Sequence, residues 1–435
     1  MDAVQLRRLK PELDSFLDRY LPLFGREENH PHAGRFLQGL LAGGERRNIE
    51  NIAEQVDGGV VRTMQKFITQ GVWDDRAVLN EMRRHTVQVL GDEDAVINVD
   101  ETGFPKKGDK SVGVQRQYAG TLGRVDNCQV GVFLNYCSAQ GHTLIDRRLF
   151  LSEEWVRDMS RRELAGVPQS VVFRTKPALA VEMIQNAVTA GVPFRWVGGD
   201  CVYGDSPTFV QTVRALDKWY VLDTSSSARV WTSEPRRRRV GHVGAKGGRP
   251  VKLAKALRKP VTVVEAAATL PASAWRRVTV AEGSQGPRMY EYAEMQVWFS
   301  EEGCPAAEPE RLLVRRSVEQ TAEIKYQRSN APSTIRLPKL AAVGGCRWTI
   351  EQDFQAGKGE CGLDEYETRG WTGWHHHTAL SLLATFFLEA QRQRLGKKIP
   401  AGDRSRSACR AAAPARRSTL GRKRNHRLVT LASAT

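Results

Sequence analysis

The segment Ala95–Asp100, which reads AVINVD, is a short run of β-branched residues that ends in an acid. A later run, Phe194–Asp200 (FRWVGGD), has the same character and also ends in aspartate. Runs of this composition predict β-strands. The end of a strand places its last side chain at the rim of a sheet, where functional groups concentrate in α/β folds. The two aspartates are therefore the first candidates for a functional site.

The sequence around these runs alternates between strand and helix patterns. Gln129–Cys137 and Thr143–Phe150 predict two strands that form a meander with the first one. Leu179–Gly191 and Ser206–Leu216 have the apolar spacing of amphipathic helices, and Trp219–Asp223 predicts a further strand. This mixture predicts an α+β or α/β core.

The flanking regions differ from this core. Residues 1–92 show helical spacing, and within them Asn48–Gln55 and Val60–Thr69 form two short helical patterns around a Gly-containing turn. Such a pair is compatible with a helix-turn-helix and with a plain helical hairpin. Residues 224–330 contain several short strand-like runs and predict a β-rich insertion. Helical patterns return after the insertion.

The positive charge is concentrated in two blocks. The 435 residues carry 65 Lys and Arg against 49 Asp and Glu, a net charge of +16. Residues 228–259 hold a net charge of +10 and residues 391–435 hold +12, which leaves −6 for the rest. Two basic blocks on a mildly acidic body favour contacts with nucleic acid. Residues 399–435 are rich in Arg, Ala, Ser and Pro and predict a basic, disordered tail, natural or produced by a frameshift.

Several classes of protein are excluded. No stretch approaches the ~18 consecutive apolar residues of a membrane helix, and the N-terminus lacks the apolar segment of a signal peptide. The seven cysteines are scattered and include no C-x-x-C pair, which argues against a disulfide scaffold and a zinc finger. These features predict a cytoplasmic protein without a membrane partner.

A third acid, Glu351, lies on a predicted helix. Carboxylates from separated segments offer the hard oxygen ligands that Mg²⁺ prefers, and Mg²⁺ is commonly held by a few carboxylates together with substrate phosphate. Paired metals of this kind activate a nucleophile and stabilise the leaving oxygen in phosphoryl transfer. Because the chain has 49 acids, residue type alone does not select this triple. The surrounding motifs do.

Two of these motifs lie at the strand ends. Asp100–Gly108 (DETGFPKKG), followed by Gln117–Gly120 (QYAG), and then Gly199–Asp205 (GDCVYGD) resemble segments of DDE transposases of the insertion-sequence-701 type. That type is related to the larger insertion-sequence-4 group. The resemblance covers about residues 1–398.

The third motif lies around Glu351. The insertion-sequence-4 group carries a signature of Tyr, two residues, Arg, three residues, Glu, six residues and Lys. Arg347, Glu351 and Lys358 match its last three members, whereas Gly344 stands where the group has tyrosine. The missing tyrosine puts in doubt a DNA contact of that side chain, and leaves the acidic residues unaffected.

The resemblance implies an RNase H-like catalytic core with a particular domain order. Residues 1–92 would form a helical DNA-binding domain. Residues 93–223 and 331–398 would form the two parts of the core, and residues 224–330 the β-rich basic insertion between them. Residues 399–435 would be the tail.

The resemblance also implies roles for the site residues. Asp100, Asp200 and Glu351 would bind Mg²⁺, or Mn²⁺ in its place, for cleavage at transposon ends and strand transfer into target DNA. Arg347 and Lys358 would contact phosphates near the scissile bond. The partners would be transposon-end DNA and target DNA, held by a homodimer on paired ends in association with the bacterial nucleoid. The alternatives are an RNase H-like DNA nuclease without strand transfer and a catalytically defective DNA-binding relic.

Further DNA contacts are predicted in the insertion. Four consecutive basic side chains would touch DNA phosphates, namely Arg236, Arg237, Arg238 and Arg239. Trp298 would stack on a displaced base, as would Trp275, with core packing as the alternative for each.

Three other groups are expected to lie outside the metal site. Glu101 adjoins Asp100, and adjacent residues on a strand point to opposite faces. Asp205 is expected on a loop. His375–His377 is expected to start a helix, where consecutive side chains diverge, and is not predicted to bind a metal.

Overall fold

The computed structural model describes residues 3–42, 44, 46–120, 123–237, 255–283, 286–318 and 323–396. The chain divides into two compact units, Met1–Ala390 and Gln391–Thr435. The second unit contributes only the end of the last helix to the described residues, and the architecture below is that of the first. The tail predicted over 399–435 lies outside the described residues.

The N-terminal part of the first unit is helical, as predicted. Its elements are α1 (Ala3–Asp18), the 3₁₀ turns η1 (Leu21–Phe24) and η2 (Glu27–Asn29), α2 (His30–Leu41), α3 (Ile49–Gln55), α4 (Val61–Thr69) and α5 (Asp75–Leu90). Side-chain caps begin two of them. Asn48 accepts a hydrogen bond from the backbone N–H of Asn51 at α3, and Asp74 accepts one from that of Arg76 at α5. Helices α3 and α4 are the pair predicted around the Gly-containing turn.

An antiparallel meander begins the central sheet. Strand β1 (Val96–Pro105) pairs with β3 (Arg124–Cys137), and β3 also pairs with β2 (Gln115–Ala119) and with β4 (His142–Leu149). All of these pairings are antiparallel. The meander is confirmed, with β2 as an addition.

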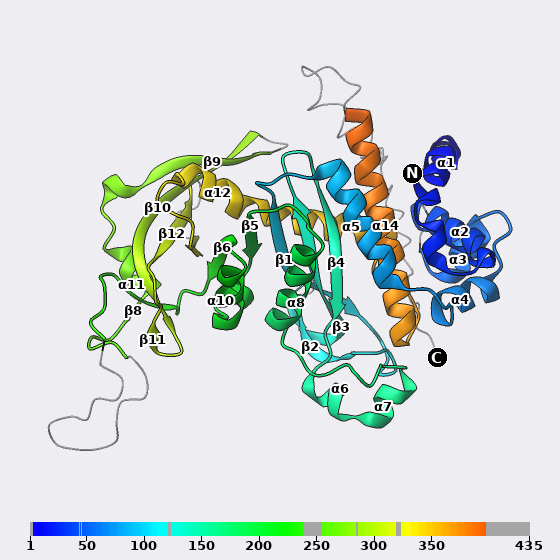
Figure 1. Ribbon diagram of the computed structural model, residues 1–435, viewed down its shortest axis with the longest axis horizontal. Coiled ribbons are helices and arrows are strands. Elements are labelled where there is room, and N and C mark those ends of the chain that lie inside the picture. The colour runs from blue at the N-terminus through cyan, green and yellow to red at the C-terminus, as the bar shows by residue number, and fades with distance from the viewer. Residues whose placement is uncertain are drawn as a thin grey trace, which may run out of the picture. The chain divides into compact units, whose positions relative to one another are not determined.

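Two parallel strands extend the sheet on the other side of β1. Strand β5 (Trp196–Gly199) is parallel to β1, and β6 (Trp219–Thr224) is parallel to β5. The order of these strands is therefore β4-β3-β1-β5-β6 (Figure 1). The connections contain α6 (Glu153–Arg157), α7 (Met159–Leu164), α8 (Lys176–Thr189), α9 (Cys201–Gly204) and α10 (Pro207–Ala215).

Different helices cover the two faces of the sheet. On one face Val99 of β1 packs in a buried cluster with Met183 of α8 and Tyr203 of α9. On the other face Phe133 of β3 packs with Phe354 of α13, in a cluster that also holds the N-terminal helices and α14. Because successive strand residues alternate between faces, two neighbouring residues of β1 face different sets of helices.

The segment predicted as a β-rich insertion continues the same sheet. Its elements are β7 (Arg229–Trp231), β8 (Val261–Thr262), α11 (Val263–Ala268), the 3₁₀ turn η4 (Ala272–Ala274), β9 (Arg276–Gly283), β10 (Gly286–Glu301), β11 (Cys304–Pro305), β12 (Glu310–Ser317) and β13 (Ile324–Ser329). Strand β13 pairs with β6, and β12 and β10 follow it (Figure 1). Strand β8 ends at Thr262, because Thr262 and Glu265 form a capping box that begins α11.

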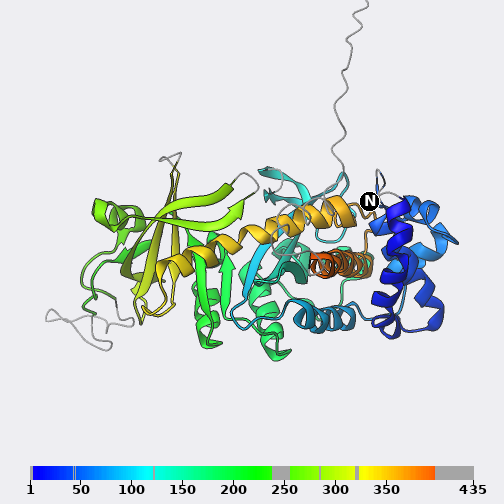
Figure 2. The same cartoon turned by 90° about the horizontal axis from the view of Figure 1, so that it is seen from above.

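Three helices complete the first unit. They are α12 (Leu337–Cys346), α13 (Trp348–Cys361) and α14 (Trp371–Gly396). Helices α12 and α13 follow one another along the sheet (Figure 2). Phe386 and Phe387 of α14 lie against Phe16 of α1 and join the N-terminal helices to the core. The fold is thus mixed α+β, as predicted. Among the described residues, no helix has the length and apolar character needed to cross a membrane.

Candidate active site

Three aspartates lie where the parallel pairing of three neighbouring strands ends, although β1 itself continues past Asp100 to Pro105 instead of ending at the acid as predicted. Val99 of β1 is in register with Gly199 of β5, and Gly199 is in register with Leu222 of β6. The next residue along the chain is acidic in each case: Asp100 and Asp223 within their strands, and Asp200 directly after β5. The carboxyl edge of the parallel strands therefore carries a row of carboxylates.

The glycines of the β5 segment let these strands pack closely. A Cβ atom on Gly198 would lie 2.3 Å from Oδ1 of Asn98 on β1, and one on Gly199 would lie 3.0 Å from Cγ1 of Val99. Larger residues would push β5 away from β1. Asp200 then turns the chain into α9, where its Oδ1 accepts a hydrogen bond of 2.9 Å from the backbone N–H of Val202.

Helix α13 brings a fourth carboxylate and a guanidinium to this edge. Glu351 lies in the first turn of α13, and Arg347 is the residue that precedes the helix. The Arg347 guanidinium lies 2.9 Å from Glu351 Oε1, 3.3 Å from Asp100 Oδ2 and 3.7 Å from Asp223 Oδ2. One arginine thus joins carboxylates from α13, β1 and β6. We call Asp100, Asp200, Asp223, Glu351 and Arg347 the carboxylate cluster.

A buried polar network fixes α13 against the sheet. Asn98 Nδ2 donates to Asn135 Oδ1 at 2.8 Å, and Asn135 Nδ2 donates to Asp353 Oδ2 at 2.5 Å. The other oxygen of Asp353 lies 2.8 Å from His142 Nδ1. Asn98 and Asn135 are fully buried, where an unmade hydrogen bond is costly. The network therefore sets the position of α13, and with it that of Glu351, relative to β1.

The carboxylate cluster carries more negative than positive charge. Burial, and next the charge of Asp200, raise the pKa of Asp100 to about 7, although Arg347 opposes this. Burial, and next the charge of Glu101, raise the pKa of Asp200 to about 6. Burial and the crowding of negative charge both disfavour the charged forms of these two carboxyl groups.

The donor chemistry of the cluster suits a hard divalent cation, since every ligand it offers is a carboxylate oxygen. In the part of the chain that the structure describes, no three His, Cys, Asp or Glu side chains are grouped tightly enough to hold a metal as they stand. The Arg347 guanidinium lies between Asp100 and Glu351 and pairs with both. The ligand types therefore fit a divalent metal, and Arg347 occupies the positions next to Asp100 and Glu351 in this structure.

A comparison with known protein families gives the decisive observation. The family described as DDE superfamily endonuclease matches residues 19–287, more than half of the chain. The chain belongs to the DDE superfamily of endonucleases. The matched region contains Asp100, Asp200 and Asp223 and ends before Glu351.

This member of the DDE superfamily also resembles an insertion-sequence transposase. It is 28% identical over 192 residues to the "Probable transposase for insertion sequence element IS701" of Microchaete diplosiphon. The match covers 43% of this chain and 47% of that protein, so the chain spans about half the length of the curated relative it matches. The resemblance inferred from the sequence motifs is confirmed.

The basic residues of the third motif lie close to the cluster of this endonuclease. Lys358 Nζ donates to Thr102 Oγ1 at 2.8 Å and to the carbonyl of Gly103 at 3.2 Å, so it contacts the continuation of β1. Arg347 makes an i,i+4 ion pair with Glu351 in addition to its contacts with β1 and β6. Their contacts with phosphate stay predictions.

The predicted DNA contacts of the insertion are only partly described. Arg236 and Arg237 are exposed, and Arg237 Nη2 donates to the carbonyl of Ala306 at 2.6 Å. Arg238 and Arg239 lie outside the described residues. Trp298 is half-buried on β10 opposite Trp231. Among the described contacts, none joins Arg236, Arg237 or Trp298 to the carboxylate cluster.

Two acids near the cluster have structural partners. Glu101 accepts hydrogen bonds of 2.7 Å from Tyr203 Oη and from Lys176 Nζ, on the face covered by α8 and α9. It therefore points away from Asp100, as expected. Asp205 lies on the turn after α9 and accepts a hydrogen bond from the backbone N–H of Ser225 at 3.1 Å.

The three consecutive histidines are structural residues of α14. His375 Nδ1 contacts the carbonyl of Trp371 at 2.9 Å, His376 Nδ1 that of Ile68 at 2.9 Å, and His377 Nε2 that of Gly362 at 2.8 Å. All three side chains are buried. The three imidazoles contact different backbone carbonyls. This agrees with the expectation that they do not form a metal cluster.

Sequence reasoning did not select two residues of this region. Asp223 ends a predicted strand in an acid, the same signal that selected Asp100 and Asp200. Trp348 is 45% exposed beside Arg347, with the Arg288 guanidinium 5.1 Å from its ring centre. The sequence gives no signal for that pair, because β9–β10 and α13 are distant in the chain.

The position of the missing tyrosine is closely packed. A Cβ atom on Gly344 would lie 2.9 Å from Nε2 of Gln327 and 3.3 Å from Cγ1 of Val221. Gln327 in turn donates a hydrogen bond of 2.8 Å to Asp223 Oδ1. Gly344 lets α12 approach β6 and β13, and a tyrosine would displace the side chain that holds Asp223.

Proposed function

We propose that this endonuclease is a transposase that cuts DNA at transposon ends and joins the freed 3′ ends to target DNA, with Asp100, Asp200 and Glu351 as its catalytic carboxylates. The observation that supports this most strongly is the meeting of these residues' elements, β1, β5 and α13, at one edge of the sheet, with Arg347 in contact with Asp100 and Glu351. Membership of the endonuclease family and the resemblance to a transposase support it independently.

An RNase H-like core is part of this proposal. It is supported by the strand order β4-β3-β1-β5-β6, with three antiparallel strands followed by two parallel ones. The proposed core consists of residues 93–223 and 331–398, with the insertion 224–330 between them. Residues 1–92 are proposed to be a DNA-binding domain.

The carboxylates are proposed to hold Mg²⁺ or Mn²⁺. When bound, such a metal polarises the scissile phosphate and neutralises its charge. Asp100, Asp200 and Glu351 supply the oxygen ligands, and the raised pKa values of the two aspartates are relieved by the added positive charge. Asp223 holds Arg347 and Gln327 in place at the third strand end.

The remaining residues of the site are proposed to position DNA. Arg347, released from Asp100 and Glu351, binds a phosphate next to the scissile bond through its planar fork of donors. Lys358 binds a second phosphate along α13, and Trp348 offers an exposed ring for a base. Water then attacks the phosphodiester at the transposon end, and the resulting 3′-hydroxyl attacks target DNA. A homodimer on two paired ends would carry out both joinings.

The test uses the purified full chain on supercoiled DNA that bears candidate terminal repeats, with and without Mg²⁺. A labelled end fragment added to a second plasmid reports strand transfer. We expect metal-dependent nicking at the ends and joined products from the labelled fragment. Nicking without joined products would favour the DNA nuclease without strand transfer.

A matched control separates the site from general effects on α13. Glu351→Gln removes a proposed ligand, whereas Glu360→Gln makes the same change on the same helix, outside the carboxylate cluster. The first variant should lose nicking and the second should keep it. End binding without any nicking by the wild-type chain in Mg²⁺ or Mn²⁺ would instead identify a DNA-binding relic.

A further inference from the structure

A second polar site lies beyond β3, at strand β4. A cavity of about 220 Å³ opens there between the sheet and the beginnings of α5, α8 and α14. Four arginines line it: Arg76 of α5, Arg147 and Arg148 of β4, and Arg174 from the segment before α8. Glu182 is the only acid that lines it among the described residues. We call this site the arginine cavity.

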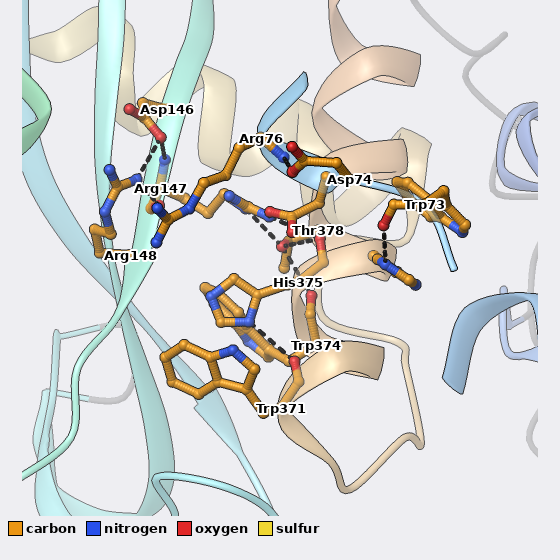
Figure 3. Close-up of polar contacts among 12 residues, drawn as sticks. Trp73, Asp74, Arg76, Asp146, Arg147, Arg148, Trp371, Trp374, His375 and Thr378 are labelled. Atoms are coloured by element: carbon orange, nitrogen blue, oxygen red, sulfur yellow. Dashed lines mark hydrogen bonds and ion pairs between the residues drawn. The ribbon is translucent and has the colours of Figure 1, made fainter. Parts of the chain in front are cut away.

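The inner part of the arginine cavity is rigid. Arg147 is 1% exposed, and its Nη2 donates to Asp75 Oδ2 at 2.5 Å and to the carbonyl of His375 at 2.8 Å. Its Nε donates to Thr378 Oγ1 at 2.9 Å. Figure 3 shows this guanidinium held between β4 and α14, beside His375 and Trp371. These bonds fix the cationic wall of the cavity before any ligand arrives.

The outer part of the cavity carries accessible cations. Arg76 is exposed, and its side chain has no ion pair or hydrogen bond with another described residue. In Figure 3 it extends from α5 toward the strand that carries Arg147 and Arg148. The Arg174 side chain is half-exposed and lies 3.8 Å from Glu182. Two guanidinium groups can therefore turn toward a ligand at little cost.

The charge of the cavity is not balanced by its surroundings. Glu182 pairs with Arg148 and Arg174, and Asp146 behind the cavity pairs with Arg148 and Arg83. Asp75 pairs with Arg147. With Asp74, whose Oδ1 accepts a hydrogen bond from the backbone N–H of Arg76, four carboxylates stand against five arginines. Burial, and next the charge of Arg147, lower the pKa of His375 to about 3, so the imidazole adds no charge near pH 7.

We propose that the arginine cavity binds a phosphate group of a DNA strand, as a contact separate from the carboxylate cluster. Guanidinium groups bind phosphate oxygens through paired, charge-assisted hydrogen bonds, and a fixed cation with mobile ones at the rim suits a group of that size and charge. Trp371 lines the same cavity and is half-buried, so that its ring can face the sugar or base beside the phosphate.

The register of the sheet supports a phosphate of DNA over free phosphate. Asp100 pairs with Phe133 of β3, and Phe133 pairs with Arg147 of β4. At a strand spacing of about 4.8 Å, the backbone at Arg147 lies roughly 10 Å from that at Asp100. The two sites therefore belong to one part of the sheet, at a separation that a DNA strand with several phosphates can span. Binding of free phosphate would require neither this proximity to the carboxylate cluster nor an aromatic ring such as Trp371.

The experiment measures binding without metal, so that it does not depend on cleavage. The probe is a fluorescein-labelled 20-bp duplex, and its affinity for the full chain is measured by anisotropy across a range of salt concentrations. Arg76→Gln and Arg174→Gln are compared with Arg84→Gln, an exposed arginine on α5 that pairs with Glu81 and does not line the cavity. Melting temperatures confirm that each variant is folded.

We expect the two cavity variants combined to bind about tenfold more weakly at low salt. The slope of log affinity against log salt should fall by about 0.9, the value for one bound phosphate, while Arg84→Gln leaves it unchanged. A slope equal to that of the control would overturn the proposal. Binding of inorganic phosphate is followed separately by ³¹P NMR. If the cavity variants abolish phosphate binding but leave duplex binding unchanged, the ligand is free phosphate and the proposal is also overturned.

A second measurement uses the unmodified protein. Oligonucleotides that carry 5-iodouracil are irradiated with the full chain, and the cross-linked peptides are identified by mass spectrometry. Adducts on the peptide that contains Trp371 would support the placement of DNA at the cavity. Adducts confined to other parts of the chain would contradict it, whatever the stability of the arginine variants.

Discussion

The carboxylate cluster and the arginine cavity lie on the same sheet and are opposite in charge. In the first, three of the four carboxylates, Asp100, Asp223 and Glu351, pair with the guanidinium of Arg347, and the pKa values of Asp100 and Asp200 are raised. In the second, four arginines line a cavity with one glutamate. Folding has left each site with an unmatched charge, which costs stability unless a ligand supplies the counter-charge. The comparison therefore predicts a cation at one site and an anion at the other.

A third polar region shows what a balanced arrangement looks like. The network of Asn98, Asn135, Asp353 and His142 is buried between α13 and the sheet, and its carboxylate has a partner at each oxygen. It needs no ligand. Paired polar groups of this kind stabilise the fold, whereas groups with unmatched charge are available to bind a ligand. Mutations in the first kind should change stability, and mutations in the second kind should change binding or cleavage.

The largest effect is expected at the carboxylate cluster. Asp100→Asn, Asp200→Asn and Glu351→Gln should each reduce DNA cleavage by more than about a hundredfold, because loss even of an outer partner of a metal site costs 10 to 100-fold. DNA binding should stay intact or become slightly tighter, since each change removes a negative charge near phosphate. Cleavage rates and anisotropy on the same end fragment check both parts. Near wild-type cleavage by any one variant would remove that residue from the proposed ligands.

Asp223 tests whether the unmatched charge extends along the whole row of strand ends. Asp223→Asn should keep the hydrogen bond with Gln327 but weaken the hold on Arg347, so we expect cleavage to fall by about tenfold. Titration of Mn²⁺ binding by electron paramagnetic resonance, without DNA, distinguishes its possible roles. An affinity equal to that of the wild type would identify a positioning residue, and a loss as large as that of Asp200→Asn would identify a ligand.

The sequence predicted these two regions to very different extents. Asp100 and Asp200 were predictable because one local pattern, a β-branched run followed by an acid, marks where the parallel pairing of β1 and β5 stops, although β1 continues to Pro105 instead of ending at Asp100. Asp223 carries the same signal at the end of a predicted strand, and only the pairing of β5 with β6 shows that it joins the other two. The longer helices and most strands followed from periodicity. The short helices α6, α7, α9 and α11 were not predicted, α11 because its capping box lies within an apolar run.

The arginine cavity had no such signal. Its arginines come from α5, β4 and the segment before α8, with no spacing in the sequence that relates them. Arg147 and Arg148 are adjacent on a strand and reach opposite sides of it, toward Asp75 and toward Glu182. Such a site depends on tertiary packing alone. The contact of Arg347 with Asp100 likewise depends on tertiary packing. Its contact with Glu351 was predicted by the i,i+4 spacing.

The balanced network should respond to pH in a direction set by His142. Burial alone would lower the pKa of His142, but the hydrogen bond and charge of Asp353 raise it above its usual value. A raised pKa in the folded state contributes stability below the unfolded pKa of about 6.5, and that contribution is lost as pH rises through the folded pKa. The melting temperature should therefore fall more between pH 6 and pH 9 in the wild type than in His142→Gln. Identical pH profiles would show that the pair is not charged.

The smallest effect is expected at the basic residues of the insertion, which provide a contrast with the arginine cavity. Arg236 is exposed, and Arg237 is exposed but bonded to the carbonyl of Ala306. Changing Arg236–Arg239 together to Gln should weaken binding to all DNA sequences alike and lower the salt slope by about 0.9 for each phosphate that is no longer bound. The single variant Arg236→Gln serves as the control that leaves the bond to Ala306 intact. Combined with the cavity variants, the slope changes should add, because the two sets of residues hold different phosphates. A run that is only a solvated loop would leave the slope unchanged, and the DNA would then be held by the cavity and the carboxylate edge without the insertion.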